Sequence, residues 1–172
     1  MPTTPQALDA LVREDAAELF MRHGIFSETE LHARHEILLD EYIKKIQIES
    51  RVLGDLAVNQ VIPTALAYQT KLIDNVCGLR DLGLDDENSQ VTVEMIKEIS
   101  RHVSAIKSTV DAMIASRKAA NKLEDARERA VAYCDDIKEK FAVIRRASDK
   151  LELLVADEDW PLVKYRELLF RH

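Results

Sequence analysis

The chain has 172 residues, which is enough for one domain with a substantial hydrophobic core. Hydrophobic residues make up 47% and charged residues 32%, a balance typical of a folded helical protein and not of a disordered one. Because 24 Lys and Arg stand against 31 Asp and Glu, the net charge is −7, which argues against a general nucleic-acid binder.

The sequence also shows no membrane span, no signal peptide and no cysteine motif. No apolar run reaches the roughly 20 residues that a membrane span needs, and residues 1–5 lack the basic and apolar regions of a signal peptide. Cys77 and Cys134 lie far apart and neither belongs to a Cys-x-x-Cys motif. We therefore expect a cytoplasmic protein with two reduced, partly buried thiols and with neither a membrane nor a nucleic acid as partner.

A short amphipathic helix and a turn are predicted for residues 1–26. Thr3 or Thr4 can cap this helix, and Pro5 suits its first turn. Gly24 ends it, because glycine readily adopts the left-handed backbone that often follows a helix.

The first long helix is predicted to begin at Ser27 and to continue to about Leu79. Ser27 and Glu30 have the spacing of a capping box, and apolar residues then recur at helical spacing. Pro63 removes one backbone hydrogen bond and its ring clashes with the preceding turn, so we expect a kink there. A helix of this length needs partner helices to cover its apolar face.

Two further long helices follow. The polar residues 83–89 predict a hairpin connection, with Asn88 or Ser89 as the cap of the second helix. Asn121 is the predicted break before a third helix over residues 123–156. The second helix carries a heptad seam, which requires a facing helix: Ile96, Ile99, Val103, Ile106, Val110 and Met113.

The predicted fold is therefore all-α: an antiparallel bundle of three long helices, the first kinked at Pro63, with a short helix at each end. Trp160-Pro161 stops the third helix, because the residue before a proline disfavours helical geometry. We expect one domain over residues 1–172, made of the N-terminal helix and turn (1–26), the long-helix bundle (27–159) and a docking tail (160–172).

His32, His35 and Glu36 form the nearest approach to a metal motif. The spacing differs from that of zinc proteases, no third ligand is evident, and the chain lacks the Glu-x-x-His pair of ferritin-like sites. A solvated or capping role is expected for these side chains.

Gln47, Arg51, Asp55 and Asn59 lie four residues apart and form one polar line on the first long helix. Such a line can be a catalytic array, a buried hydrogen-bond network or a contact strip for another domain. The network and the contact strip are favoured, because buried polar groups need partners.

The sequence contains no motif of an active site. It has no glycine-rich phosphate loop, no Gly-x-Ser-x-Gly elbow and no paired Cys and His nucleophile motif. We therefore predict no catalytic, cofactor-binding or metal-ligating residue in this chain.

Several stretches of the chain resemble one family closely. The ending DWPLVKYRELLF at 159–170 is the most specific. The others are PTT at 2–4, IQIESRVLGD at 46–55, IPTA at 62–65, YQ at 68–69, AYCDD at 132–136 and DKLE at 149–152. Over essentially its whole length the chain resembles the C-terminal region of type III glutamine synthetases.

The resemblance implies a role as the C-terminal structural or oligomerisation domain of a larger enzyme. Enzymes of that family ligate ammonia to glutamate with ATP and Mg²⁺ or Mn²⁺, and their catalytic motifs lie upstream of the region matched here. The implied partners are the chain's own catalytic domain and neighbouring subunits of a homo-oligomer. Two alternatives remain: a free-standing coiled-coil adaptor, suggested by the heptad seam, and a metal-carboxylate bundle enzyme.

Overall fold

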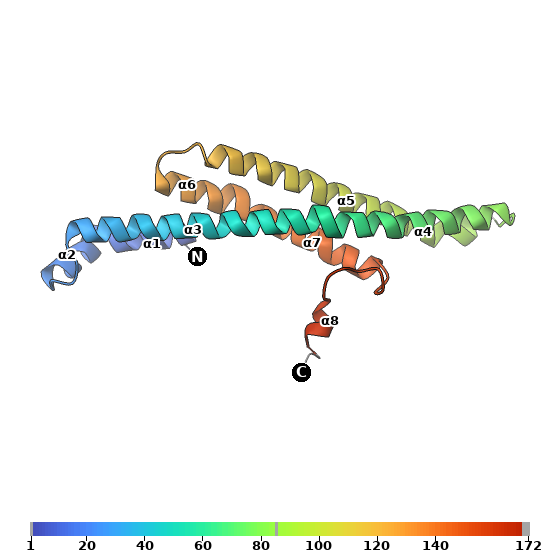
Figure 1. Ribbon diagram of the computed structural model, residues 1–172, viewed down its shortest axis with the longest axis horizontal. Coiled ribbons are helices and arrows are strands. Elements are labelled where there is room, and N and C mark those ends of the chain that lie inside the picture. The colour runs from blue at the N-terminus through green and yellow to red at the C-terminus, as the bar shows by residue number, and fades with distance from the viewer. Residues whose placement is uncertain (1, 85, 170–172) are drawn as a thin grey trace. The chain divides into compact units, whose positions relative to one another are not determined.

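The computed structural model describes residues 2–84 and 86–169, and every regular element in these ranges is a helix (Figure 1). This confirms the predicted all-α fold with three long helical runs packed together and short helices at both ends. The elements are α1 (Thr4–Asp9), a 3-10 turn (Ala10–Val12), α2 (Glu14–Arg22), α3 (Glu28–Leu56), a π-helical turn (Ala57–Val61), α4 (Ile62–Asp81), α5 (Asp86–Ala120), α6 (Ala126–Ala132), a second π-helical turn (Tyr133–Lys138), α7 (Glu139–Leu154) and α8 (Tyr165–Leu168).

The chain folds as two compact units. Unit 1 comprises Met1–Val52 and Ala112–Phe141, and unit 2 comprises Leu53–Asp111 and Ala142–His172. Each unit therefore contains segments of all three long helical runs. The assignment of residues 1–172 to one domain, with a bundle at 27–159 and a docking tail, stays a prediction.

The core of unit 1 forms where apolar side chains recur at steps of three and four along its helices. On α3 these side chains leave less than a tenth of their surface exposed, and they share the core with Tyr133, which is fully buried. The buried apolar residues of unit 1 include Leu31, Leu39, Ile43, Ile46, Met113, Ala120, Ala130, Tyr133 and Ile137.

The entry into α3 follows the predicted capping box. The Ser27 amide donates to Glu30 Oε2 at 2.8 Å, and the Glu30 amide donates to Ser27 Oγ at 3.3 Å. Gly24 has φ +63°, the left-handed conformation expected of it. The prediction of a single N-terminal helix is wrong, because the extended backbone of Arg13 separates α1 and its 3-10 turn from α2.

The core of unit 2 is built around the heptad seam of α5. Ile99 and Ile106 are fully buried, as are Ile144 and Leu151 of α7 in the same unit. The seam prediction is confirmed, since Ile99, Ile106, Val110 and Met113 are all buried while Ile96 and Val103 are half-buried. Ala57, Val61, Ala65 and Val76 complete the buried face of the first run in unit 2.

Near Pro63, where a kink was expected, the structure has the π-helical turn Ala57–Val61. The Ile62 amide donates to the carbonyl of Ala57, five residues back instead of four. Pro63 cannot donate to the carbonyl of Asn59, and its ring would press against that group in a regular helix. The wider turn immediately before α4 accommodates the proline without ending the helical run.

Three boundaries differ from the sequence-based expectation. Helix α5 begins at Asp86, so Asn88 and Ser89 lie inside it and not at its cap. The third run begins at Ala126, because the Asp125 side chain accepts a hydrogen bond from the Glu128 amide at 2.7 Å. Within the predicted tail helix only α8 is helical, and Phe170 lies outside the described residues, as does Asp85 of the predicted connection.

The segment between α7 and α8 is held to unit 2 by two lysines. Lys164 Nζ donates to the Glu152 carbonyl at 3.0 Å and to Asp157 Oδ1 at 2.5 Å. Lys71 Nζ of α4 lies 2.7 Å from Asp159 Oδ1. Trp160, between these contacts, is buried with 8% of its surface exposed.

The seam of α5 yields a direct test of the core. We expect Ile106→Ala to lower the free energy of unfolding by about 2–5 kcal/mol, because it removes a fully buried side chain and leaves a cavity. The measurement is urea unfolding followed by circular dichroism. Val91→Ala on the same helix is the matched control, since Val91 is 74% exposed and its truncation should change the stability little. Equal effects of the two substitutions would contradict this packing.

Candidate functional site

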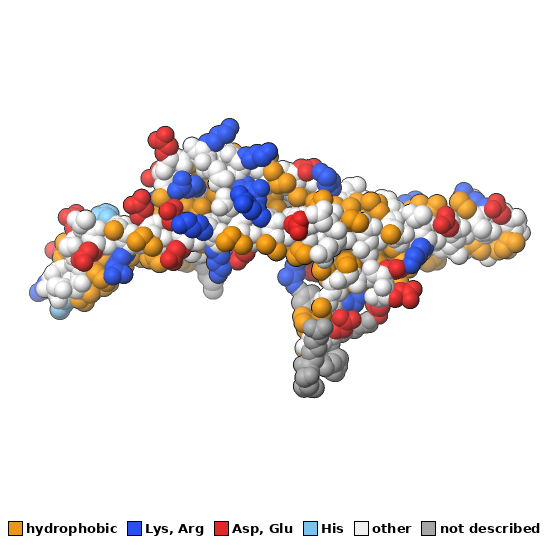
Figure 2. Space-filling view, in the orientation of Figure 1, with side chains coloured by type: hydrophobic (Ala, Val, Ile, Leu, Met, Phe, Trp, Pro, Cys, Tyr) orange, Lys and Arg blue, Asp and Glu red, His pale blue; other side chains and the backbone are white. Residues whose placement is uncertain are grey.

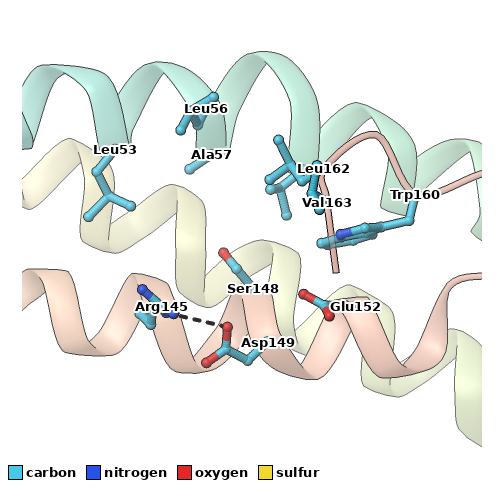
Figure 3. Close-up of a pocket in the computed structure, with 11 residues that line it drawn as sticks. Leu53, Leu56, Ala57, Arg145, Ser148, Asp149, Glu152, Trp160, Leu162 and Val163 are labelled. Atoms are coloured by element: carbon cyan, nitrogen blue, oxygen red, sulfur yellow. Dashed lines mark ion pairs between the residues drawn. The ribbon is translucent and has the colours of Figure 1, made fainter. Parts of the chain in front are cut away.

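A cavity of about 190 Å³ lies in unit 2 (Figure 3). One side is apolar and comes from the first helical run, with Leu53, Leu56, Ala57 and Val61. The opposite side comes from α7, where Figure 3 shows Arg145 and Asp149 as an ion pair; their closest atoms are 3.6 Å apart. Trp160, Leu162 and Val163 close the cavity from the segment after α7.

The polar atoms around this cavity do not form a catalytic arrangement. Arg145 and Asp149 neutralise each other, and the exposed fractions of their side chains, 60% and 47%, place the pair in contact with solvent. The Trp160 Nε1 group is buried and has no hydrogen-bond partner among the residues that the structure describes. The cavity can hold a small apolar group. Sequence reasoning missed it because the first helical run that forms one wall is more than 80 residues away from the other lining residues.

A second cluster surrounds the hydroxyl group of Tyr133 in unit 1. Tyr133 is fully buried, and its hydroxyl donates to Asn121 Oδ1 at 2.7 Å. Burial raises the pKa of Tyr133 above its usual value, while the positive charge of Arg117, the Gln47 side chain and Arg51 oppose that shift. Side chains from α3, from the end of α5 and from the following turn therefore all influence this one hydroxyl group.

Tyr42 lies in the same unit and differs from Tyr133 in the hydrogen bonding of its hydroxyl group. Its hydroxyl group is buried and has no hydrogen-bond partner within the described part of the chain. Burial raises the pKa of Tyr42, and the neighbouring Cys134 thiol raises it further. Cys134 is half-buried and Cys77 is exposed, so the expectation of a partly buried thiol is wrong for Cys77; both thiols are free.

The predicted polar line divides between the two units. Gln47 and Arg51 belong to unit 1, where Gln47 is half-buried and Arg51 is exposed, and both oppose the rise in the pKa of Tyr133. Asp55 and Asn59 belong to unit 2, are exposed, and hydrogen-bond each other at 2.5 Å. Only this first half acts on the buried Tyr133 hydroxyl. Asn121 and Arg117, which act on the same hydroxyl, were not singled out because periodicity carries no signal for contacts between distant helix ends.

The predicted histidine pair also separates. His35 Nε2 lies 3.2 Å from Asp9 Oδ1, and Arg127 donates hydrogen bonds to both oxygens of the Asp9 carboxylate. His32 and Glu36 are exposed. Asp9, His35 and Arg127 thus join α1, α3 and α6 within unit 1.

Metal and membrane features were searched over residues 2–84 and 86–169. In these ranges no three His, Cys, Asp or Glu side chains are grouped so that they could hold a metal ion. The described side chains accordingly do not fit the metal ion that the family resemblance implies for full-length enzymes. Nor does any described helix combine the length and the apolar character that crossing a membrane demands.

Several aliphatic side chains of the long helices point outward. On α3 in unit 1, Ile37, Ile48 and Val52 are each more than half exposed. On α4 in unit 2, Leu66 and Ile73 are 45% and 43% exposed. The fold thus defines a long-helix scaffold with apolar residues left on its surface.

Comparison with known proteins finds similarity to glutamine synthetases. Residues 1–80 match the family model of the glutamine synthetase C-terminal domain. A glutamine synthetase of Bacteroides fragilis (strain YCH46) is 43% identical over 169 residues, which is 96% of this chain and 23% of that protein. A type-3 glutamine synthetase of Dictyostelium discoideum is 28% identical over 173 residues, and a glutamine synthetase of Butyrivibrio fibrisolvens is 25% identical over 166 residues.

The chain is homologous to the C-terminal domain region of glutamine synthetases, which confirms the resemblance found in the sequence. It spans about a quarter of the length of these relatives, with 24% of each of the latter two covered.

Two tyrosines of unit 1 have buried hydroxyl groups and make a matched pair. We expect Tyr133→Phe to destabilise the protein by about 1 kcal/mol, because the hydrogen bond to Asn121 is lost. Tyr42→Phe should leave the stability unchanged or raise it by up to about 1 kcal/mol, since it removes a buried hydroxyl that lacks a partner. Thermal unfolding of both variants measures the difference, and a larger loss for Tyr42→Phe would contradict the assignment.

The Asp9 cluster predicts a pH-dependent contribution to stability. The hydrogen bonds from Arg127, followed by the Arg127 charge and His35, hold the pKa of Asp9 below its usual 3.8 despite desolvation. A lowered folded-state pKa stabilises the fold above pH 3.8, and this contribution disappears as the pH falls through 3.8 to the lower pKa of the folded state.

Unfolding of Asp9→Asn across a pH series measures this contribution. The difference in melting temperature from the parent chain should be largest near neutral pH and should shrink below pH 3.8. Glu36→Gln is the control, because Glu36 is exposed on α3 and its replacement should cause little change at any pH. A constant deficit for Asp9→Asn over the whole series would refute the electrostatic origin.

Proposed function

We propose that this chain acts by contact, as the helical C-terminal structural and oligomerisation domain of a glutamine synthetase. In this proposal it packs on the catalytic domain or between neighbouring subunits of a homo-oligomer. Homology to the C-terminal domain region, over about a quarter of the length of the relatives, supports the proposal.

The proposal assigns the chemistry to other parts of the enzyme. ATP-dependent ligation of ammonia to glutamate, with Mg²⁺ or Mn²⁺, would belong to the full-length protein, and no catalytic, cofactor-binding or metal residue is assigned here. We also propose that the protein works in the cytoplasm, without a nucleic acid or a membrane as its partner.

The observation that carries the proposal is the outward position of aliphatic side chains on a chain that already has a buried core. Ile37 and Ile48 of unit 1 are 57% and 62% exposed, and Leu66 and Ile73 of unit 2 are also exposed. Clustered exposed apolar side chains typically mark contact surfaces for other proteins. A scaffold that is covered by the rest of an enzyme would present such residues.

The alternative of a free-standing coiled-coil adaptor has less support. Its motive was the heptad seam of α5, which needs a facing helix. Ile99 and Ile106 of that seam are fully buried within unit 2 itself. The seam therefore has its partners inside this chain and does not call for an external helix.

Sedimentation velocity tests the proposal. The full chain is mixed with the separately produced remainder of a glutamine synthetase polypeptide, and a faster-sedimenting complex that contains both is expected. A helical protein of similar size and charge with no match to this family serves as the control. Independent sedimentation of the two components over the accessible concentration range would overturn the proposed function.

A further inference from the structure

The cavity of unit 2 contains a buried hydrogen-bond donor that has no partner. Trp160 has only 8% of its surface exposed, and its Nε1 group meets no acceptor in residues 2–84 and 86–169. Figure 3 shows the indole ring and its nitrogen extending into the space between the first helical run and α7. Most buried polar groups in folded proteins are hydrogen-bonded, so an exception of this kind points to a missing partner.

The segment around the indole group is held by ion pairs on both sides. Before the indole group, Asp159 Oδ1 lies 2.7 Å from Lys71 Nζ of α4. After it, Lys164 Nζ lies 2.5 Å from Asp157 Oδ1. Contacts within the chain therefore keep this wall of the cavity in place, and a ligand does not have to bear the entropic cost of ordering it.

The charges around the cavity favour an uncharged ligand. The lining side chains carry two carboxylates, Asp149 and Glu152, against the one guanidinium group of Arg145. Arg145 pairs with Asp149, so a ligand anion would face the remaining carboxylate of Glu152. Figure 2 shows Asp and Glu side chains gathered on the surface at the end of α7, where an approaching anion would meet them. A protonated amine could approach Glu152, but it has no lone pair to accept a hydrogen bond from Trp160.

The volume and the apolar wall of the cavity restrict the ligand further. The cavity measures about 190 Å³, and a cavity of roughly 150 Å³ with Leu, Ile and Phe walls takes up benzene. The side chains of Leu53, Leu56 and Ala57 offer no polar partner, whereas a buried water needs about two to four of them. A compact hydrocarbon body therefore suits this wall better than water does.

We propose that this cavity is a binding site for a small uncharged molecule with a compact apolar body and one carbonyl or hydroxyl oxygen. The oxygen accepts a hydrogen bond from Trp160 Nε1, and the apolar body packs against Leu53, Leu56 and Ala57. The inference goes beyond the proposed function and does not depend on it, because every residue that lines the cavity belongs to unit 2.

Nuclear magnetic resonance of the full ¹⁵N-labelled chain tests the site directly. Trp160 is the only tryptophan of the chain, so a single indole N–H signal reports on the cavity. The probe is cyclohexanone, an uncharged ketone of suitable size, and its control is cyclohexylammonium, which has the same ring but no acceptor. We expect cyclohexanone to shift the indole signal in a saturable way and cyclohexylammonium to leave it in place.

Ser148→Leu tests whether the probe occupies this cavity. Ser148 lines the cavity, so the larger side chain fills space that cyclohexanone needs and should weaken its binding at least about tenfold. Ser104→Leu is the matched control and should retain the parent affinity, since Ser104 is exposed on α5 of the same unit. Circular dichroism checks that both variants stay folded, and the two probes on the parent chain decide the question even if Ser148→Leu does not fold.

Three results would overturn the inference: an indole signal that cyclohexanone leaves unchanged, equal shifts with both probes, or equal affinity of the two folded variants. A shift caused by the remainder of a glutamine synthetase polypeptide but not by cyclohexanone would overturn it as well, because the cavity would then be a contact between polypeptides. A saturable shift with cyclohexanone alone supports the inference whether or not the chain forms a complex with that remainder, so the two proposals can fail separately.

Discussion

Burial of one apolar seam along each long helical run is the interaction on which the structure depends. Isolated helices in water are marginal, so most of their stability comes from packing of an apolar face. In unit 1, Leu39, Ile43 and Ile46 of α3 share the core with Tyr133 and Ile137. In unit 2 the seam of α5 is buried together with Ile144 and Leu151 of α7.

Polar contacts within the units determine how the packed elements are oriented. Asp9 connects α1 with α3 and α6 through His35 and Arg127, and Lys164 fixes the segment after α7 by its bonds to Glu152 and Asp157. These contacts orient elements whose burial is already favourable, because ion pairs near the surface contribute little by themselves. The outward faces remain free to differ, and on α3 that face exposes the aliphatic residues Ile37, Ile48 and Val52.

Hydrophobic periodicity and local helix signals predicted most of the fold. The capping box at Ser27, the α5 seam and the break at Asn121 follow from local chemistry, and the structure has each of them. Local chemistry did not predict that α5 starts at Asp86 or that the N-terminal helix is divided at Arg13. Several polar residues in each stretch can cap or continue a helix. The π-helical turn at Tyr133–Lys138 was not predicted, because it contains no proline that would indicate an irregular helix.

The candidate site was less accessible to sequence reasoning. Gln47 and Arg51 stood out because they repeat every four residues. Arg117 and Asn121, which act on the same Tyr133 hydroxyl, lie more than 60 residues away and depend on tertiary packing. The resemblance to glutamine synthetases was accessible for a different reason, because the ending at 159–170 and the other quoted stretches are specific strings of residues. Comparison with known proteins finds a similarity of this kind over 96% of the chain.

The central claim is that this chain contributes contacts and leaves the chemistry to its partner. A ligase assay with ATP, Mg²⁺, glutamate and ammonia tests it most directly, on the chain alone, on the remainder of a glutamine synthetase alone and on their mixture. The account predicts no glutamine formation by the chain alone and a higher rate for the mixture than for the remainder. Turnover by the chain alone at a rate comparable to that of a full-length enzyme would contradict it.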